Sequence, residues 1–148
     1  MVPYRRFKEV KMITFQQQPT EDTCMITCLA MFLDRPVKEM MDKYHNLLYK
    51  KEIWLDDILD DFKIPYFYGH PRKAQLNQGF VYLLTVASLN IQGGLHEILL
   101  EFDRSRNITV FDPNKGKDGI LYYVYGDPKN DNEVSLVTWT IDLGIGII

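Results

Sequence analysis

Cys24 is the residue of this chain whose type and position most favour nucleophilic chemistry. It follows the polar residues 18–23 and opens the apolar run CMITCLAMFL, so we expect it in the first turn of a helix. Unpaired backbone N–H groups and the helix dipole at such a position favour a thiolate over a thiol. The alternative is a small buried cysteine, which is how we interpret Cys28, one turn deeper among apolar residues.

A cysteine nucleophile needs a base, and the chain offers His45, His70 and His96. We expect His45 at the end of a helix and His70 in a loop. His96 opens the apolar run LHEILLEF directly after two glycines, so the sequence predicts it on a strand at a sheet edge. A rigid strand suits base catalysis, because proton transfer needs the imidazole within hydrogen-bond reach of the sulfur. Its structural alternative is a histidine of the sheet without chemistry.

Asp112 is the candidate for orienting the base. If residues 95–103 and 107–112 pair as an antiparallel hairpin, the start of the first strand lies near the end of the second. That pairing brings His96 close to Asp112, whose carboxylate would hold the imidazole tautomer and stabilise the imidazolium. The alternative for Asp112 is a turn residue before proline.

Gln18 stands six residues before Cys24, outside the expected helix. Its side-chain amide is placed to donate to the oxyanion of a tetrahedral intermediate, together with the backbone N–H of Cys24. Because two further glutamines precede it, the alternative is the polar end of a strand.

The elements that must position these residues divide into two halves. Periodicity and capping signals predict helices at 24–33, capped by Asp22 or Thr23, at 37–45, opened by Pro36, and at 53–62. Strands are predicted at 65–69, 79–87, 95–103, 107–112, 120–125 and 134–141, with 126–132 as a turn between the last two. Helices followed by strands indicate an α+β fold, with N-terminal helices that carry the nucleophile packed on a C-terminal antiparallel sheet.

Several acidic residues repeat along the expected helix 53–62. Their spacing allows paired acid–base carboxylates or a cation site, but surface charges on an amphipathic helix explain them more simply. The uncharged C-terminal residues 143–148 are open to interpretation as a strand, a partner-binding segment or a mobile end.

Composition limits the class of protein. The 148 residues fit one domain, 1–148, and 46% hydrophobic with 25% charged residues is typical of a globular protein. The net charge of −3 predicts no nucleic-acid partner and no attraction to anionic lipid, and the basic pairs Arg5–Arg6 and Arg72–Lys73 are interpreted as solvated charges. No apolar run of about 18 residues and no signal peptide is recognised, so we expect a cytoplasmic protein outside the membrane. Two thiols without paired histidines predict no metal, and we expect no cofactor; the oligomeric state stays open.

Taken together, these residues resemble the peptidase C39 family and its free-standing relatives in the papain-like cysteine peptidase superfamily. Residues 18–31 are similar to the family's Gln-x5-Cys-x3-Cys-Leu-Ala-Met nucleophile motif, and LHEILLEFD and VFDPNKG are similar to its histidine strand and its Asp-Pro turn. The resemblance implies a papain-like fold. It also implies Cys24 as nucleophile, His96 as base, Asp112 as orienter and Gln18 as oxyanion donor.

The activity implied by the resemblance is that of a cysteine-dependent peptidase or isopeptidase acting on a protein or peptide substrate. Met25 departs from the family, whose members commonly have glycine after the cysteine, and the expected lack of a membrane span means that leader processing is not carried over. Other enzymes use the same triad, so a deamidase, a transglutaminase-like enzyme or an acyltransferase stays open. So does an inactive papain-like scaffold that binds or inhibits a partner protein.

Overall fold

The structure is a computed structural model that describes residues 13–147. The predictions made for Arg5–Arg6 and for Ile148 lie outside these residues. The helical elements are α2 (Cys24–Leu33), α3 (Val37–Met40), the π-helix η1 (Met41–His45), α4 (Asn46–Tyr49) and α5 (Leu55–Asp61). The strands are β1 (Phe67–Tyr68), β2 (Phe80–Ala87), β3 (Leu95–Phe102), β4 (Ile108–Phe111), β5 (Tyr122–Val124), β6 (Glu133–Ser135) and β7 (Thr140–Gly146).

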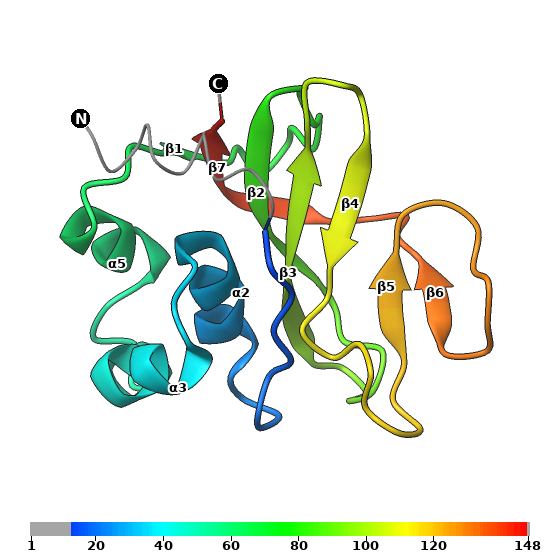
Figure 1. The fold of residues 1–148 in the computed structure, drawn as a ribbon, viewed down its shortest axis with the longest axis horizontal. Helices are drawn as coiled ribbons and strands as arrows, with labels where there is room; N and C mark the ends of the chain where they lie inside the picture. The colour runs from blue at the N-terminus through cyan, green and yellow to red at the C-terminus, as the bar shows by residue number, and fades with distance from the viewer. Residues whose placement is uncertain (1–12, 148) are drawn as a thin grey trace.

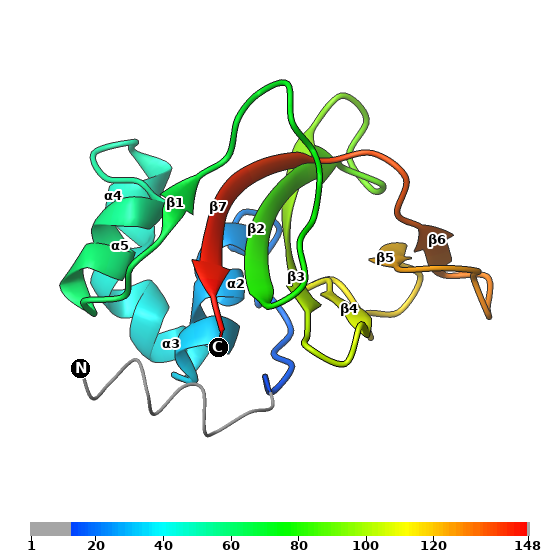
Figure 2. The same cartoon turned by 90° about the horizontal axis from the view of Figure 1, so that it is seen from above.

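Five strands form an antiparallel sheet in the order β1-β7-β2-β3-β4, and β5 and β6 form a separate two-stranded parallel sheet. The helices lie on one side of the larger sheet and the β5–β6 pair lies on the other (Figures 1 and 2). The prediction of an α+β fold with helices packed on an antiparallel sheet is therefore confirmed. None of the helices described in 13–147 is long and apolar enough to cross a membrane.

Both faces of the larger sheet are covered by a hydrophobic core. Each strand contributes to both cores, because its successive side chains point to opposite faces. Leu83 and Leu99 face the helices and pack in one core with α2, whereas Leu84 and Ile98 face β5 and β6 in a second core. Cys28 is fully buried in the first core, which confirms its interpretation as a core residue.

The helices begin close to their predicted positions but differ in detail. α2 starts at Cys24 as expected, but no side chain caps it: the hydroxyl of Thr23 hydrogen-bonds Thr20 instead. The second helical segment does not end at His45, since it continues through η1 and α4 to Tyr49. Leu48 explains the extension, because it packs against the helix-side core.

The prediction of one strand over 134–141 is wrong. β6 ends at Ser135, and the chain crosses from the small sheet to the large one before β7 begins at Thr140. β7 then lies between β1 and β2 with Leu143 and Ile145 fully buried, so most of the apolar C-terminus is a core strand. Residues 126–132 connect β5 and β6 through bends and turns, as predicted, and the two strands that they join are parallel.

The acidic residues of α5 lie on its outer side, as their interpretation as surface charges predicts. Asp57, Asp60 and Asp61 are exposed and Asp56 is partly exposed. Three of them accept hydrogen bonds from tyrosine hydroxyls, at 2.6 to 2.9 Å, which fixes their position against the sheet and the second helical segment.

Candidate active site

Cys24 is the first residue of α2, and its side chain is partly exposed. The first N–H groups of a helix have no partner within the helix, and no side chain caps this one. The partial positive charge of that helix end therefore acts on the Cys24 sulfur. α2 packs along β3, the strand that carries His96.

His96 lies on an interior strand and not on the edge strand that we predicted, because β3 is paired with β2 on one side and β4 on the other. However, β4 pairs only with Leu99–Phe102, so β3 at His96 extends beyond the end of β4. One side of β3 is thus unpaired at the histidine, whose side chain is 7% exposed.

The predicted contact between His96 and Asp112 is present. His96 Nε2 lies 2.7 Å from Asp112 Oδ1, and Asp112 is 1% exposed. The same carboxylate accepts backbone hydrogen bonds from Asn114 at 2.9 Å and from Tyr123 at 2.8 Å. Three donors thereby fix both oxygens of Asp112, and through them the plane of the imidazole.

The pKa of His96 is raised to about 9. Burial acts to lower it, but hydrogen bonds with Asp112 and with the Cys24 side chain, together with the negative charges on both, outweigh burial. Because Asp112 occupies Nε2, Nδ1 is the nitrogen left to face the sulfur. A histidine with this pKa is an imidazolium at neutral pH.

Gln18 is buried, and its side chain shares neither a hydrogen bond nor a cavity with Cys24 among the described residues. Its backbone N–H donates to the Pro113 carbonyl at 2.8 Å, which ties it to the Asp-Pro turn. Its Nε2 donates to the Thr20 carbonyl at 2.7 Å, and no residue of 13–147 donates a hydrogen bond to its Oε1. Gln18 lines a separate cavity of about 160 Å³, which is also lined by His96 but not by Cys24. One amide hydrogen is thus used, and the role of Gln18 at an oxyanion stays a prediction.

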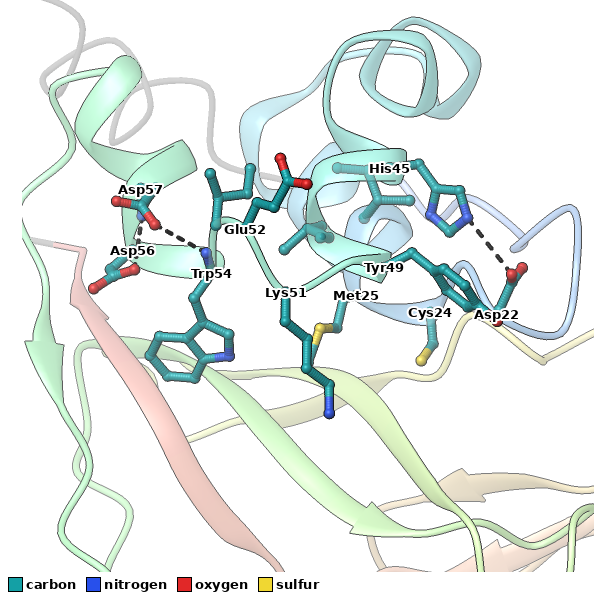
Figure 3. Close-up of a pocket in the computed structure, with 13 residues that line it drawn as sticks. Asp22, Cys24, Met25, His45, Tyr49, Lys51, Glu52, Trp54, Asp56 and Asp57 are labelled. Carbon is teal, nitrogen blue, oxygen red and sulfur yellow. Dashed lines mark hydrogen bonds and ion pairs between the residues drawn. The ribbon is translucent and has the colours of Figure 1, made fainter.

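A groove of about 810 Å³ begins at Cys24 and runs between α2 and the later helices. Figure 3 shows Met25 on this path between Cys24 and Trp54. The lining is mostly apolar, with Leu48 and Ile53 as further contributors. Charged groups line it as well: Asp22, Lys51, Glu52, Asp56 and Asp57.

A smaller cavity of about 100 Å³ lies against the other side of Cys24 and includes His96. Sequence reasoning missed two of its polar residues, Thr85 and Glu97. One signal was available, because Glu97 is a charged residue directly after the histidine and before the apolar residues 98–100. Cys24 and Met25 line both this cavity and the groove, so the two cavities meet at these residues.

Comparisons with protein-family models, with curated proteins and with solved structures find no match for this chain. The resemblance to the C39 family accordingly rests on the motifs alone. Chemically, the site joins a partly exposed cysteine at a helix start to a buried, oriented histidine, which is the arrangement that nucleophilic acyl transfer requires.

Proposed function

We propose that this chain is a papain-like, C39-like cysteine peptidase or isopeptidase. Cys24 is its nucleophile, His96 its acid and base, and Asp112 the residue that orients His96. The observation that carries the proposal is the buried contact of 2.7 Å between His96 Nε2 and Asp112 Oδ1, which leaves Nδ1 for Cys24 at the start of α2. Orientation of a base by a buried carboxylate is the geometry of nucleophile–base–orienter triads.

Acylation proceeds from the thiolate–imidazolium pair. The Cys24 thiolate attacks the substrate carbonyl carbon, and the carbonyl oxygen takes the electron pair as an oxyanion. The backbone N–H of Cys24 and the second amide hydrogen of Gln18 donate to it. When the C=O bond re-forms, the C–N bond breaks, and the departing nitrogen takes the proton from His96 Nδ1. A thioester on Cys24 remains.

Deacylation uses the same residues in the reverse roles. His96, now neutral, takes a proton from water through Nδ1 as the water oxygen attacks the thioester carbon. The C–S bond breaks, the acid product leaves, and the thiolate and imidazolium are restored. Asp112 stabilises the imidazolium in both half-reactions.

The two cavities at Cys24 define the direction of a bound peptide. The leaving amine must lie beside His96, which protonates it, and of the two cavities that Cys24 lines the one of about 100 Å³ is also lined by His96. The long groove contains Cys24 but not His96, so it receives the acyl side of the substrate. Its mostly apolar lining, which includes Met25 beside the sulfur, suits a peptide segment with apolar side chains.

A peptide library tests this proposal with mass-spectrometric detection of new termini. The wild type should cut a subset of peptides, whereas Cys24→Ala should cut none. Cys28→Ala is the matched control and should keep activity, because burial, followed by the charges on Glu97, Cys24 and Asp112, raises the pKa of the Cys28 thiol well above its ordinary value.

The same experiment separates the alternatives that share the triad. Cleavage gives two shorter peptides, deamidation replaces an amide NH₂ with OH without cutting the chain, and acyl transfer adds a group to an acceptor. Cleavage that persists in Cys24→Ala would rule out Cys24 as the nucleophile. A wild type that leaves every peptide unchanged would favour a binding scaffold over an enzyme.

A further inference from the structure

Three polar side chains from neighbouring strands meet under the small cavity at Cys24. Thr85 of β2 lies directly opposite Glu97 of β3, and Asp142 belongs to β7 on the other side of β2. Asp142 is the extra residue of a β-bulge, because Leu83 pairs with Leu143 while Leu84 pairs with Ile141. Bulges re-aim side chains, and this one brings a third polar group to the pair.

The hydroxyl of Thr85 links the two carboxyl groups. Thr85 Oγ1 lies 2.6 Å from Asp142 Oδ2 and 3.2 Å from Glu97 Oε1. A hydroxyl has one hydrogen to donate, and the shorter contact assigns it to Asp142. The contact with Glu97 is then a hydrogen bond only if Glu97 carries a proton.

Glu97 is buried and lacks a counter-charge. It is 2% exposed, and no residue of the described chain donates a hydrogen bond to its Oε2. The ion pairs found between described residues involve neither Glu97 nor Asp142. Burial raises the pKa of Glu97 well above its ordinary range, and the charge of Asp142 and a hydrogen bond shared with it raise it further. Glu97 Oε2 is thus a buried acceptor without a donor among the described residues.

The cavity above this cluster opens beside the reacting sulfur. Cys24, His96 and Glu97 all line it, and Leu95 beside them is 77% exposed. Its volume of about 100 Å³ has room for the head of one side chain. Within 13–147 no three side chains of His, Cys, Asp or Glu are grouped to hold a metal ion, so an organic cation fits the cluster better.

We propose that this cavity binds a cationic side chain, lysine or arginine, on the leaving-group side of the scissile bond, with Glu97 and Asp142 as the residues that select it. The inference rests on the proposed function, because His96 defines the leaving-group side. An ammonium or guanidinium would donate a hydrogen bond to Glu97 Oε2, and its charge would attract Asp142, which Thr85 links to Glu97 from behind the cavity. A neutral or anionic side chain would leave the buried Oε2 of Glu97 without a donor.

Thiol-reactive probes of matched size test the cavity without a peptide substrate. Cys24 is treated with 2-aminoethyl, propyl or 2-sulfonatoethyl methanethiosulfonate, and peptide mapping confirms the labelled cysteine. Each rate is divided by that of the same reagent with free 2-mercaptoethanol. For the wild type we expect the cationic probe to be preferred over the neutral one by about tenfold, the effect of one charged hydrogen bond.

The variants decide whether the cavity causes that preference. Glu97→Gln keeps the shape of protonated Glu97 and should fold, and Asp142→Asn removes the second carboxylate. Each should reduce the preference to about threefold and the double variant should abolish it, whereas Glu39→Gln, at an exposed glutamate of α3 that lines neither cavity, should leave it unchanged. A wild-type preference near unity, or one that survives in the double variant, would overturn the inference. Failure of the proposed function shows separately, as a slow reaction of Cys24 with the neutral probe.

Discussion

Two histidine–aspartate pairs flank Cys24, and they differ in geometry and burial. In one pair His96 Nε2 lies 2.7 Å from Asp112, and the side chains are 7% and 1% exposed. In the other, His45 Nε2 lies 3.6 Å from Asp22, and the side chains are 19% and 51% exposed. Both pairs contain the same residue types, so residue type alone does not define the catalytic base.

The difference lies in what holds each carboxylate. Backbone N–H groups of Asn114 and Tyr123 fix Asp112 in the interior. Asp22 is exposed, and its pKa is held below the ordinary value first by a hydrogen bond from the Thr20 hydroxyl and only in smaller part by His45. An exposed pair of this kind contributes little free energy, whereas a buried and hydrogen-bonded one orients its imidazole.

Replacing each histidine should give the largest contrast between the two pairs. His96→Ala removes the group that donates and accepts the proton, so we expect kcat/KM for a cleaved peptide to fall by about a thousandfold. His45→Ala is the matched control and should keep kcat within about twofold, because an exposed pair of this kind holds no reacting proton. Equal losses in the two variants, at unchanged thermal stability, would contradict the assignment of His96 as the base.

Replacing each aspartate should give a smaller contrast, in stability as well as in activity. Asp112→Ala leaves a buried imidazolium and two backbone N–H groups without their acceptor, so we expect the free energy of unfolding in urea to fall by about 3 kcal/mol. Asp112→Asn keeps one acceptor oxygen for His96 Nε2 and should retain more activity than Asp112→Ala. Asp22→Ala should change the free energy of unfolding by less than about 1 kcal/mol.

The pH dependence of turnover should show the raised pKa of His96. The leaving amine takes its proton from the imidazolium, and His96 keeps that proton until the pH approaches about 9. The kcat/KM should therefore be maintained above the ordinary histidine pKa of about 6.5 and be lost as the pH rises through about 9. A loss already centred near the ordinary value would mean that Asp112 and Cys24 do not hold the proton on His96.

The contacts that sequence reasoning predicted are those that one hairpin determines. β3 and β4 are adjacent in the chain and joined by a short turn, so their pairing alone brings His96 to Asp112. The start of α2 at Cys24 was likewise local, since it follows from a change from polar to apolar residues. Local pairings of this kind are determined by turn length and side-chain alternation.

The remaining features depend on contacts between distant parts of the chain. β7 takes its place between β1 and β2 because Leu143 and Ile145 complete a core begun by α2, and nothing near them in sequence signals this. The meeting of Thr85, Glu97 and Asp142 depends in addition on a bulge in β7. The hydrogen bond from the side-chain amide of Gln18 to the Thr20 carbonyl could not be predicted either, because only the folded loop brings that carbonyl to the amide.

The most direct test of the central claim is the pH profile of Cys24 alkylation by iodoacetamide in the wild type and in His96→Ala. The thiolate–imidazolium pair predicts that the wild type reacts at about pH 6 nearly as fast as at about pH 8, whereas in His96→Ala, where only the helix end acts on the sulfur, the half-maximal rate moves up toward the pH of about 8.5 of a free thiol. A wild-type profile that already follows the free thiol, and that does not change in His96→Ala, would contradict the account.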